Sequence, residues 1–221
     1  MIEEKLQHIR AAIADAERAA GRALGSVRLV AASKGQPPSA VQAAARVGQG
    51  IFGENYAREM CQKRLETSRS PGNLEWHFIG RVQASNAKDI ASAVLVHGVG
   101  SLAQARALAK RGPVAVLLQV SLWGEATKNG FNQSEIERDL PVLREMQGLH
   151  LRGLMAMPPS GPAPRQAFAA VRELRDALAP ELPELSMGMS ADFCEAILEG
   201  ATLVRIGTAL FGARPPHQEP A

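Results

Sequence analysis

The sequence predicts a single-domain α/β fold, a (β/α)8 TIM barrel over residues 1–221. Eight short apolar runs alternate with amphipathic helical patterns along the chain, and this alternation is typical of a parallel sheet covered by helices. Eight strands close naturally into a barrel, whereas the alternative, an open doubly wound sheet, usually has fewer strands.

The elements follow one another in a regular order. Ile2, Leu6, Ile9 and Ile13 recur at helical spacing before Gly21, which predicts an N-terminal helix over 2–22. Strands are expected at 28–33, 50–54, 75–80, 93–99, 114–120, 151–157, 184–189 and 202–207. The intervening helices are expected at 38–47, 55–64, 85–93, 101–110, 133–146, 165–178 and 191–200, with one more helix starting at Thr208 and a short tail at 214–221.

Composition excludes several classes of protein. The net charge is +3, but lysines and arginines are scattered among acidic residues, so we expect neither nucleic acid nor a membrane surface as a partner. Two cysteines offer no disulfide framework. The start of the chain, "MIEEKLQHIR", lacks the apolar region of a signal peptide, and no stretch is long enough to span a membrane. We therefore expect a cytoplasmic protein.

One motif matches a dinucleotide-binding pattern but lies in the wrong context for that function. "GQGIFG" at 48–53 matches the G-x-G-x-x-G pattern of dinucleotide-binding folds. That fingerprint needs glycines that follow a strand and open a helix, so that the helix N-terminus meets the pyrophosphate. Here the glycines follow a helical pattern and enter a strand, and the dinucleotide interpretation is rejected.

Polar residues gather where the predicted strands end. Lys34 directly follows the apolar run "LVAAS" and is expected at the end of the first strand. The functional face of a barrel is formed by the carboxyl ends of its strands, so the polar residues there become candidates. They are Lys34, Glu54, Asn55, Tyr56, His77, Glu125, Lys128, Ser190, Arg205, Gly207 and Thr208.

The last two loops suggest a phosphate site. Barrels commonly hold phosphate with the loops after strands 7 and 8, through backbone N–H groups and a helix N-terminus. "GMSADFCEAI" places Ser190 as a helix N-cap, and "RIGTALFG" places Gly207 and Thr208 at the next helix start. The alternative is that both segments are ordinary helix caps.

Arg205 alternates with Val204 and Ile206 and is expected to face the barrel interior. A buried guanidinium needs a partner, because an unpaired buried charge is very costly. The partner would be a carboxylate, such as Glu54 or Glu125, or a ligand atom.

A strand-end lysine, a phosphate site and an arginine together fit pyridoxal 5′-phosphate (PLP). Its aldehyde can form a Schiff base with lysine, and it carries a ring nitrogen and a phosphate. A Schiff-base aldolase fits the same residues. The simplest alternative is that Lys34 only forms an ion pair at the end of the barrel. Lys128 is the rival lysine, within a polar loop that keeps it solvated.

At this point the chain resembles the pyridoxal phosphate homeostasis protein family. The similar blocks are "LVAASKGQP", "FGENYAREM", "EWHFIGRVQ", "LLQVSLWGEATKNG", "LRGLMAMPP", "LSMGMSADFCEAI" and "VRIGTALFGAR", in the family's order. The resemblance implies an alanine-racemase-like barrel without the β-rich second domain. It implies a covalent aldimine of PLP to Lys34, with Asn55 near the cofactor, Ser190, Gly207 and Thr208 at its phosphate, and Arg205 at its ring nitrogen. His77 completes the candidate cofactor-binding set, and no metal ligand or catalytic residue is expected. The family usually has Thr or a similar residue after the lysine, where this chain has Gly35.

The resemblance also implies a role in intracellular vitamin B6 homeostasis without strong catalysis. An arginine at the ring nitrogen disfavours the pyridinium form and weakens the cofactor as an electron sink. Racemases of this type also need a tyrosine from a second domain, whereas this chain has one tyrosine, Tyr56, and ends soon after the last barrel element. The expected partners are PLP and the apo-enzymes that receive it, and the expected state is a monomer. An amino-acid racemase or Schiff-base aldolase remains the alternative.

Overall fold

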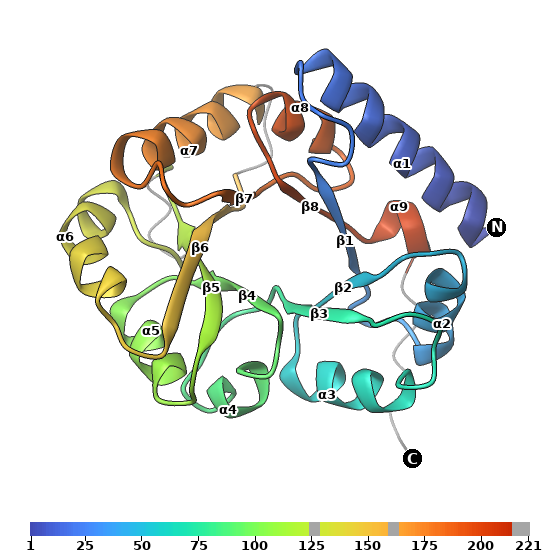
Figure 1. Ribbon diagram of the computed structural model, residues 1–221, viewed down its shortest axis with the longest axis horizontal. Coiled ribbons are helices and arrows are strands. Elements are labelled where there is room, and N and C mark those ends of the chain that lie inside the picture. Colours follow the sequence, from blue (N-terminus) through green and yellow to red (C-terminus); the bar gives the residue numbers. More distant parts are fainter. Residues whose placement is uncertain (124–128, 159–163, 214–221) are drawn as a thin grey trace.

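The computed structural model describes residues 1–123, 129–158 and 164–213, and these form a closed barrel of eight parallel strands (Figure 1). Each strand pairs with the next, and the last pairs with the first. The strands are β1 (Arg28–Ala32), β2 (Ile51–Glu54), β3 (Glu75–Phe78), β4 (Leu95–Val99), β5 (Val114–Val120), β6 (Leu149–Ala156), β7 (Glu184–Ser186) and β8 (Leu203–Ile206). The predicted barrel is confirmed, and the open sheet is excluded.

The helices form a ring outside the strands (Figure 1). They are α1 (Ile2–Ala19), α2 (Pro38–Arg46), α3 (Ala57–Glu66), α4 (Ala87–Ile90), α5 (Leu102–Ala109), α6 (Gln133–Arg144), α7 (Pro164–Leu178), α8 (Phe193–Leu198) and α9 (Thr208–Phe211). The N-terminal α1 packs against α8 and α9, and so covers the side of the barrel where β8 meets β1 (Figure 1).

Differences from the predicted elements are confined to their ends. Helix α4 spans only Ala87–Ile90, although the sequence predicts a helix over 85–93. Its amphipathic pattern has only two buried positions, Ala87 and Ile90, so tertiary packing stabilises little more than one turn. The predicted tail at 214–221 lies outside the described residues.

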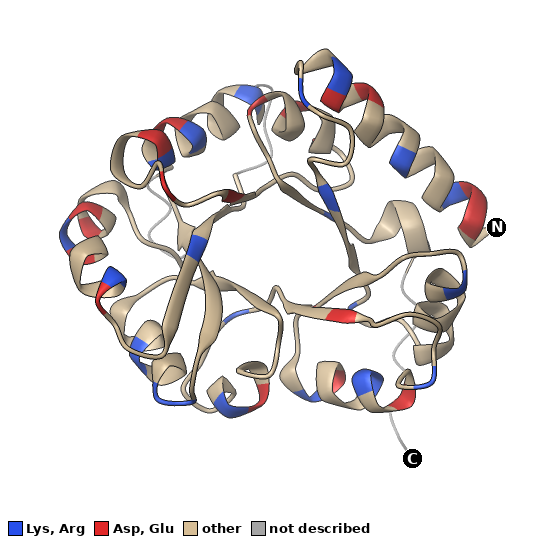
Figure 2. Cartoon of the chain, viewed as in Figure 1, with Lys and Arg blue, Asp and Glu red and all other residues tan. Residues whose placement is uncertain are grey.

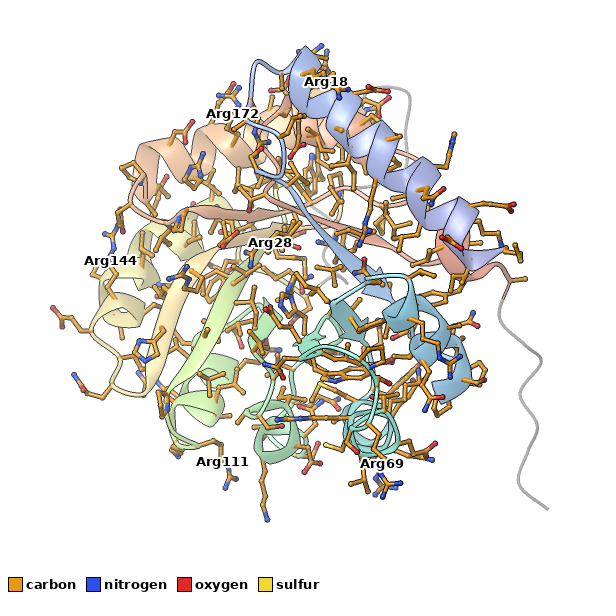
Figure 3. The ribbon with its side chains drawn as sticks, turned by 45° about the vertical axis from the view of Figure 1, so that its right-hand side comes forward. Arg18, Arg28, Arg69, Arg111, Arg144 and Arg172 are labelled. Atoms are coloured by element: carbon orange, nitrogen blue, oxygen red, sulfur yellow. The ribbon has the colours of Figure 1, made fainter. Side chains whose placement is uncertain are left out.

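Charged residues lie mainly on the outer helices, where both signs are interspersed (Figure 2). In Figure 3 the labelled Arg28 lies near the middle of the molecule, whereas Arg18, Arg69, Arg111, Arg144 and Arg172 lie at its periphery. Arg28 begins β1 and pairs with Glu184 of β7 at 2.5 Å. Among the helices that the structure describes, none combines the length and apolar character that a membrane crossing requires.

Two apolar layers follow from the two-residue period of the strands. The larger core lies between sheet and helices and includes the fully buried rings of Phe52, Phe78 and Phe168. Residues at alternate strand positions fill the barrel interior as a second cluster, which contains Val30, Leu95, Leu117, Met155 and Leu203. Burial of both faces explains why the strands are continuous apolar runs in the sequence.

A chain of polar side chains also crosses the barrel interior. Arg205 Nη1 donates to Ser186 Oγ at 2.6 Å, Ser186 Oγ lies 2.8 Å from His97 Nδ1, and His97 Nε2 lies 2.9 Å from His77 Nδ1. Because a guanidinium only donates, the Ser186 hydroxyl accepts from Arg205. The imidazole tautomers decide which atom donates in the two histidine contacts. Both orders of donors that satisfy these contacts leave the two imidazoles neutral.

Burial also favours neutral imidazoles at this depth. It lowers the pKa of His77 to about 4, helped by the positive charge of Arg28. It lowers the pKa of His97 well below the usual histidine value, with His77 as the next cause. His77 Nε2 is buried without a hydrogen-bond partner among the described residues, and the nearest carboxylate oxygen, Glu75 Oε2, lies 3.9 Å away.

We expect the histidine pair to make the barrel sensitive to acid. The unfolded chain binds a proton at each histidine near pH 6.5, whereas the folded chain does not until about pH 4 at His77. The contribution of the neutral pair to the free energy of unfolding is therefore fully present above pH 6.5, and it is lost as the pH falls toward 4. A shift of this size corresponds to an upper bound of roughly 3 kcal/mol. The measurement is the free energy of unfolding by urea, from pH 4 to 7, for the wild type and for His77→Gln. The difference between these two free energies should shrink as the pH falls.

His8→Gln is the matched control, since His8 is exposed on α1. Its free energy of unfolding should follow the wild-type pH profile. A difference between wild type and His77→Gln that stays constant across this range would contradict the buried neutral pair.

Candidate functional site

Lys34 lies in a turn just beyond β1. The strand ends at Ala32, so Lys34 comes two residues later than the strand end, not at the strand's last residue as predicted. Gln36 N–H donates to Ser33 O at 3.0 Å across the turn, and Gly35 has a φ of +69°. This left-handed conformation at the third turn position favours glycine, and it reverses the chain directly after the lysine.

A cavity of about 350 Å³ opens at the carboxyl ends of the strands. It contains six of the seven predicted cofactor-binding residues. The described residues that line it are Ala32, Lys34, Gln36, Asn55, Ile79, Met157, Met189, Ser190, Ala191, Arg205, Gly207, Thr208 and Gly212. The seventh, His77, does not line the cavity but belongs to the polar chain inside the barrel.

Closure of the barrel brings the first and last strands, β1 and β8, together here. In the β1–β8 pair, Val30 is opposite Arg205 and Ala31 is opposite Ile206. Gly207 then follows β8 beside Ala32, where a Cβ atom at position 207 would lie 3.0 Å from Ala32 O. A larger side chain would therefore press on the backbone of Ala32, which lines the cavity.

The loop after β7 differs from the prediction. Asp192, not Ser190, is the N-cap residue of α8, and its Oδ1 accepts from Met189 N–H at 2.7 Å. The predicted N-cap role of Ser190 is therefore wrong, because Asp192 closes the loop two residues later. Ser190 is exposed and lines the cavity, so its hydroxyl is available to a ligand.

Arg205 is held by oxygen atoms of neighbouring strands and not by Glu54. Its Nη1 donates to Ser186 O at 2.9 Å and to Ser186 Oγ, and its Nη2 donates to Ala156 O at 3.1 Å. These bonds use three of five N–H donors, in a side chain that also lines the cavity. Burial lowers the pKa of Arg205 to about 10, so the guanidinium stays charged at neutral pH. The other carboxylate considered as a partner, Glu125, and the rival lysine, Lys128, lie outside the described residues.

Asn55 contributes an acceptor without a partner. Its Oδ1 is buried, and among the described residues no donor reaches it. The backbone of Asn55 packs so closely on Gly80 that a Cβ atom there would lie 2.0 Å from Asn55 O. A buried acceptor in this position costs free energy unless a ligand or water donates to it.

Sequence reasoning missed a buried ionic cluster behind the Lys34 turn. Lys63 Nζ donates to Glu54 Oε1 and Glu59 Oε1, both at 2.7 Å, and to Ser33 O at 2.6 Å. Burial raises the pKa of Glu54 to about 7, against the lowering effect of Lys63. The spacing of Glu59 and Lys63, four residues apart on α3, is the sequence pattern that could have indicated the pair.

A second hollow of about 350 Å³ lies at the amino ends of β1 and β2 and is less suited to a ligand. Its charged groups already bind the protein. Glu17 accepts from Val27 N–H at 2.7 Å and from Gly25 N–H at 3.0 Å, and Arg10 donates to Gly48 O at 2.7 Å. The cavity at Lys34 is therefore the candidate site.

The chemistry of the site suits an anionic ligand with a carbonyl group. An amine and a guanidinium provide positive charge, the hydroxyls of Ser190 and Thr208 provide hydrogen-bond donors, and Ile79, Met157 and Met189 provide apolar walls. Within the described part of the chain, no three His, Cys, Asp or Glu side chains are grouped so that they could hold a metal ion.

Comparisons with family models, curated proteins and solved structures point to the same family. The model of the alanine racemase N-terminal domain family matches residues 5–215. A pyridoxal phosphate homeostasis protein of Pseudomonas aeruginosa is 43% identical over 222 residues, with 96% of each chain covered. PipY of Synechococcus elongatus, solved with PLP bound, is similar at a TM-score of 0.83 and 33% identity, over 96% of this chain and 100% of that chain.

A more distant likeness shows the fold alone. An alanine racemase of Clostridium difficile has a TM-score of 0.67 at 14% identity, and the match covers 87% of this chain but 53% of the racemase. The barrel, the cavity and the full-length matches agree. The chain belongs to the pyridoxal phosphate homeostasis proteins, within the alanine racemase N-terminal domain family.

Proposed function

We propose that this protein binds PLP in the cavity at Lys34 and serves intracellular PLP homeostasis, with little catalysis of its own. The observation that carries the proposal is the convergence of Lys34, Arg205 and the segments around Ser190 and Gly207 on one cavity. PLP supplies an aldehyde, an aromatic nitrogen and a phosphate, and the cavity offers a group suited to each.

Each part of the cofactor has a candidate partner. Lys34 is the residue that would bond to the aldehyde as a Schiff base. Ser190, Thr208 and the backbone N–H groups at the start of α9 would bind the phosphate, since the first N–H groups of a helix have no partner within it. Arg205, charged and fixed by Ser186 and Ala156, would donate to the ring nitrogen. Asn55 would accept a hydrogen bond from the ligand.

The same residues argue against strong catalysis. A guanidinium that remains charged leaves the ring nitrogen unprotonated, which weakens the cofactor as an electron sink. Of the residues described around the cavity, only Lys34 and Arg205 are ionisable. Tyr56, the one tyrosine of the sequence, is 68% exposed and is not among them. A second acid or base for racemisation is therefore not provided by the described walls.

The remaining parts of the proposal concern partners and place. We propose that the protein works in the cytoplasm as a monomer and passes PLP to apo-enzymes. The relatives support the homeostasis role, since they are named pyridoxal phosphate homeostasis proteins. Exposed Met157 and Met189 at the cavity leave its entrance open for exchange.

Lys34→Ala should abolish covalent attachment of PLP, because the cavity then lacks an amine to bond with the aldehyde. The visible absorbance band of the loaded protein and the adduct formed by borohydride should both disappear, and peptide mass mapping of the wild type should locate the adduct on Lys34. Lys88→Ala, an exposed lysine of α4, is the control and should load normally. An adduct on Lys128 would contradict the assignment.

Pyridoxal, which lacks the phosphate, should bind at least ~100-fold more weakly than PLP. Hydrogen bonds to a charged group contribute about 1.5–3 kcal/mol each, so the loss of several costs orders of magnitude in affinity. Ser190→Ala should narrow the ratio of the two dissociation constants, whereas Ser134→Ala on the exposed face of α6 should not. Equal affinities for pyridoxal and PLP would remove the phosphate site.

Loaded protein should transfer PLP to an apo-enzyme and show little steady-state turnover. Two measurements are compared. One is the reactivation of an apo-aminotransferase by the loaded protein, and the other is its steady-state turnover of alanine, serine, other amino acids and phosphosugars. A kcat/KM of about 10⁴ M⁻¹s⁻¹ or more, the lower end of the usual enzyme range, would make the protein a racemase-type enzyme or aldolase instead. Trace reaction with amino acids is compatible with the proposal, since accessible amines exchange with a Schiff base.

A further inference from the structure

The buried cluster behind the Lys34 turn contacts both residues that flank the lysine. Lys63 is 3% exposed, and its Nζ makes three hydrogen bonds, which use all three protons of an ammonium group. One of them goes to Ser33 O at 2.6 Å. The Ser33 hydroxyl in turn donates to Glu54 Oε1 at 2.6 Å.

On the other side of the lysine, Glu59 binds the backbone. Gly35 N–H donates to Glu59 Oε1 at 2.6 Å, and the same oxygen accepts from Lys63. Ser33 and Gly35 are thus joined through one carboxylate and one ammonium on α3. The backbone before and after Lys34 is fixed by charge-assisted hydrogen bonds, which are roughly twice as strong as neutral ones.

The stability of the loop alone does not explain this buried ionic cluster. Lys63 and Glu54 are almost completely buried, and burial of an ion pair gains little stability compared with apolar residues of the same size. The cluster provides a single geometry for the turn, because directed hydrogen bonds join it to Ser33 and to Gly35.

We propose that Glu59 and Lys63 are positioning residues, which hold the Lys34 turn so that the lysine amine meets the aldehyde of a bound cofactor. This inference rests on the proposed function and deepens it. In the step concerned, the Lys34 amine nitrogen forms a C–N bond to the aldehyde carbon. The carbonyl oxygen then leaves as water with both amine protons, and a C=N bond remains. Neither Glu59 nor Lys63 lines the cavity, so their effect would reach the ligand only through Lys34.

The test compares two ligands on the full-length protein. PLP can bond to Lys34, whereas pyridoxine 5′-phosphate has the same ring and phosphate with an alcohol in place of the aldehyde. Glu59→Ala removes the acceptor of Gly35 N–H and should weaken PLP binding by roughly tenfold or more, as expected for a lost charged hydrogen bond. Its affinity for pyridoxine 5′-phosphate should change by less than about threefold, a small effect on the same scale.

Glu59 is the residue chosen because Lys63 still pairs with Glu54 at 2.7 Å after its removal. Removal of Lys63 would instead leave the buried Glu54 without its cation. Glu59→Asp retains the charge but is one methylene too short to reach both Gly35 and Lys63, so it should lose less PLP affinity than Glu59→Ala. Glu59→Gln retains an acceptor oxygen for Gly35 N–H and should also bind PLP more tightly than Glu59→Ala. Glu66→Ala, an exposed glutamate on the same helix, is the matched control and should bind both ligands like the wild type.

The outcomes are distinct. A selective loss of PLP affinity and of the rate of borohydride-reducible adduct formation supports the positioning role. Equal losses of affinity for both ligands, or no loss in Glu59→Ala and Glu59→Asp, overturn the positioning role without contradicting the proposed function. Absence of a reducible adduct in the wild type overturns the proposed function itself.

Discussion

The pairing of β1 with β8 is the constraint on which the rest of the molecule depends. It closes the sheet, and its register places Val30 opposite Arg205 and Ala31 opposite Ile206. The turn after β1 and the loop after β8 are thereby adjacent, with Gly207 against Ala32. An open sheet of the same strands would leave the amine of Lys34 and the guanidinium of Arg205 on opposite edges. The site is a consequence of closure.

Closure also creates an interior that must be filled, and here part of the filling is polar. Ser186, His97 and His77 continue inward from Arg205 through successive hydrogen bonds. An arginine at the cavity is tolerated because strand carbonyls and the Ser186 hydroxyl satisfy it, and because neutral histidines below it add no further charge. The cost is a barrel whose core contains two groups that acid can protonate.

The sequence predicted the architecture well because each strand is buried on both faces and so forms a continuous apolar run. The limits predicted for β5 coincide with Val114–Val120. Lys34 lies beyond the strand because contacts distant in sequence hold Ser33 and Gly35 against α3. The N-cap prediction failed for a local reason, since Asp192 accepts from Met189 N–H and takes the N-cap position two residues after Ser190.

Charge pairing was the least predictable part of the site. Glu54 was considered as a partner of Arg205, but Lys63 from the following helix neutralises it. A helical pair such as Glu59 and Lys63 is ordinarily a solvated surface feature, and nothing in the local pattern says that this one is buried. Only the packing of α3 against the ends of β1 and β2 makes it part of the site.

The candidate site draws on the first and last strands of the barrel, and this has a consequence for biosynthesis. A ribosome delivers Lys34 early, but Arg205, Gly207 and Thr208 emerge only when the barrel is almost fully translated. Contacts between segments so far apart in the chain form late, since their loop-closure entropy is not offset until the intervening units have packed. Under the proposed function, a nascent chain would carry the Lys34 amine before the segments proposed to bind the phosphate and the ring nitrogen. Retention of PLP would then report that the whole barrel has been translated and folded.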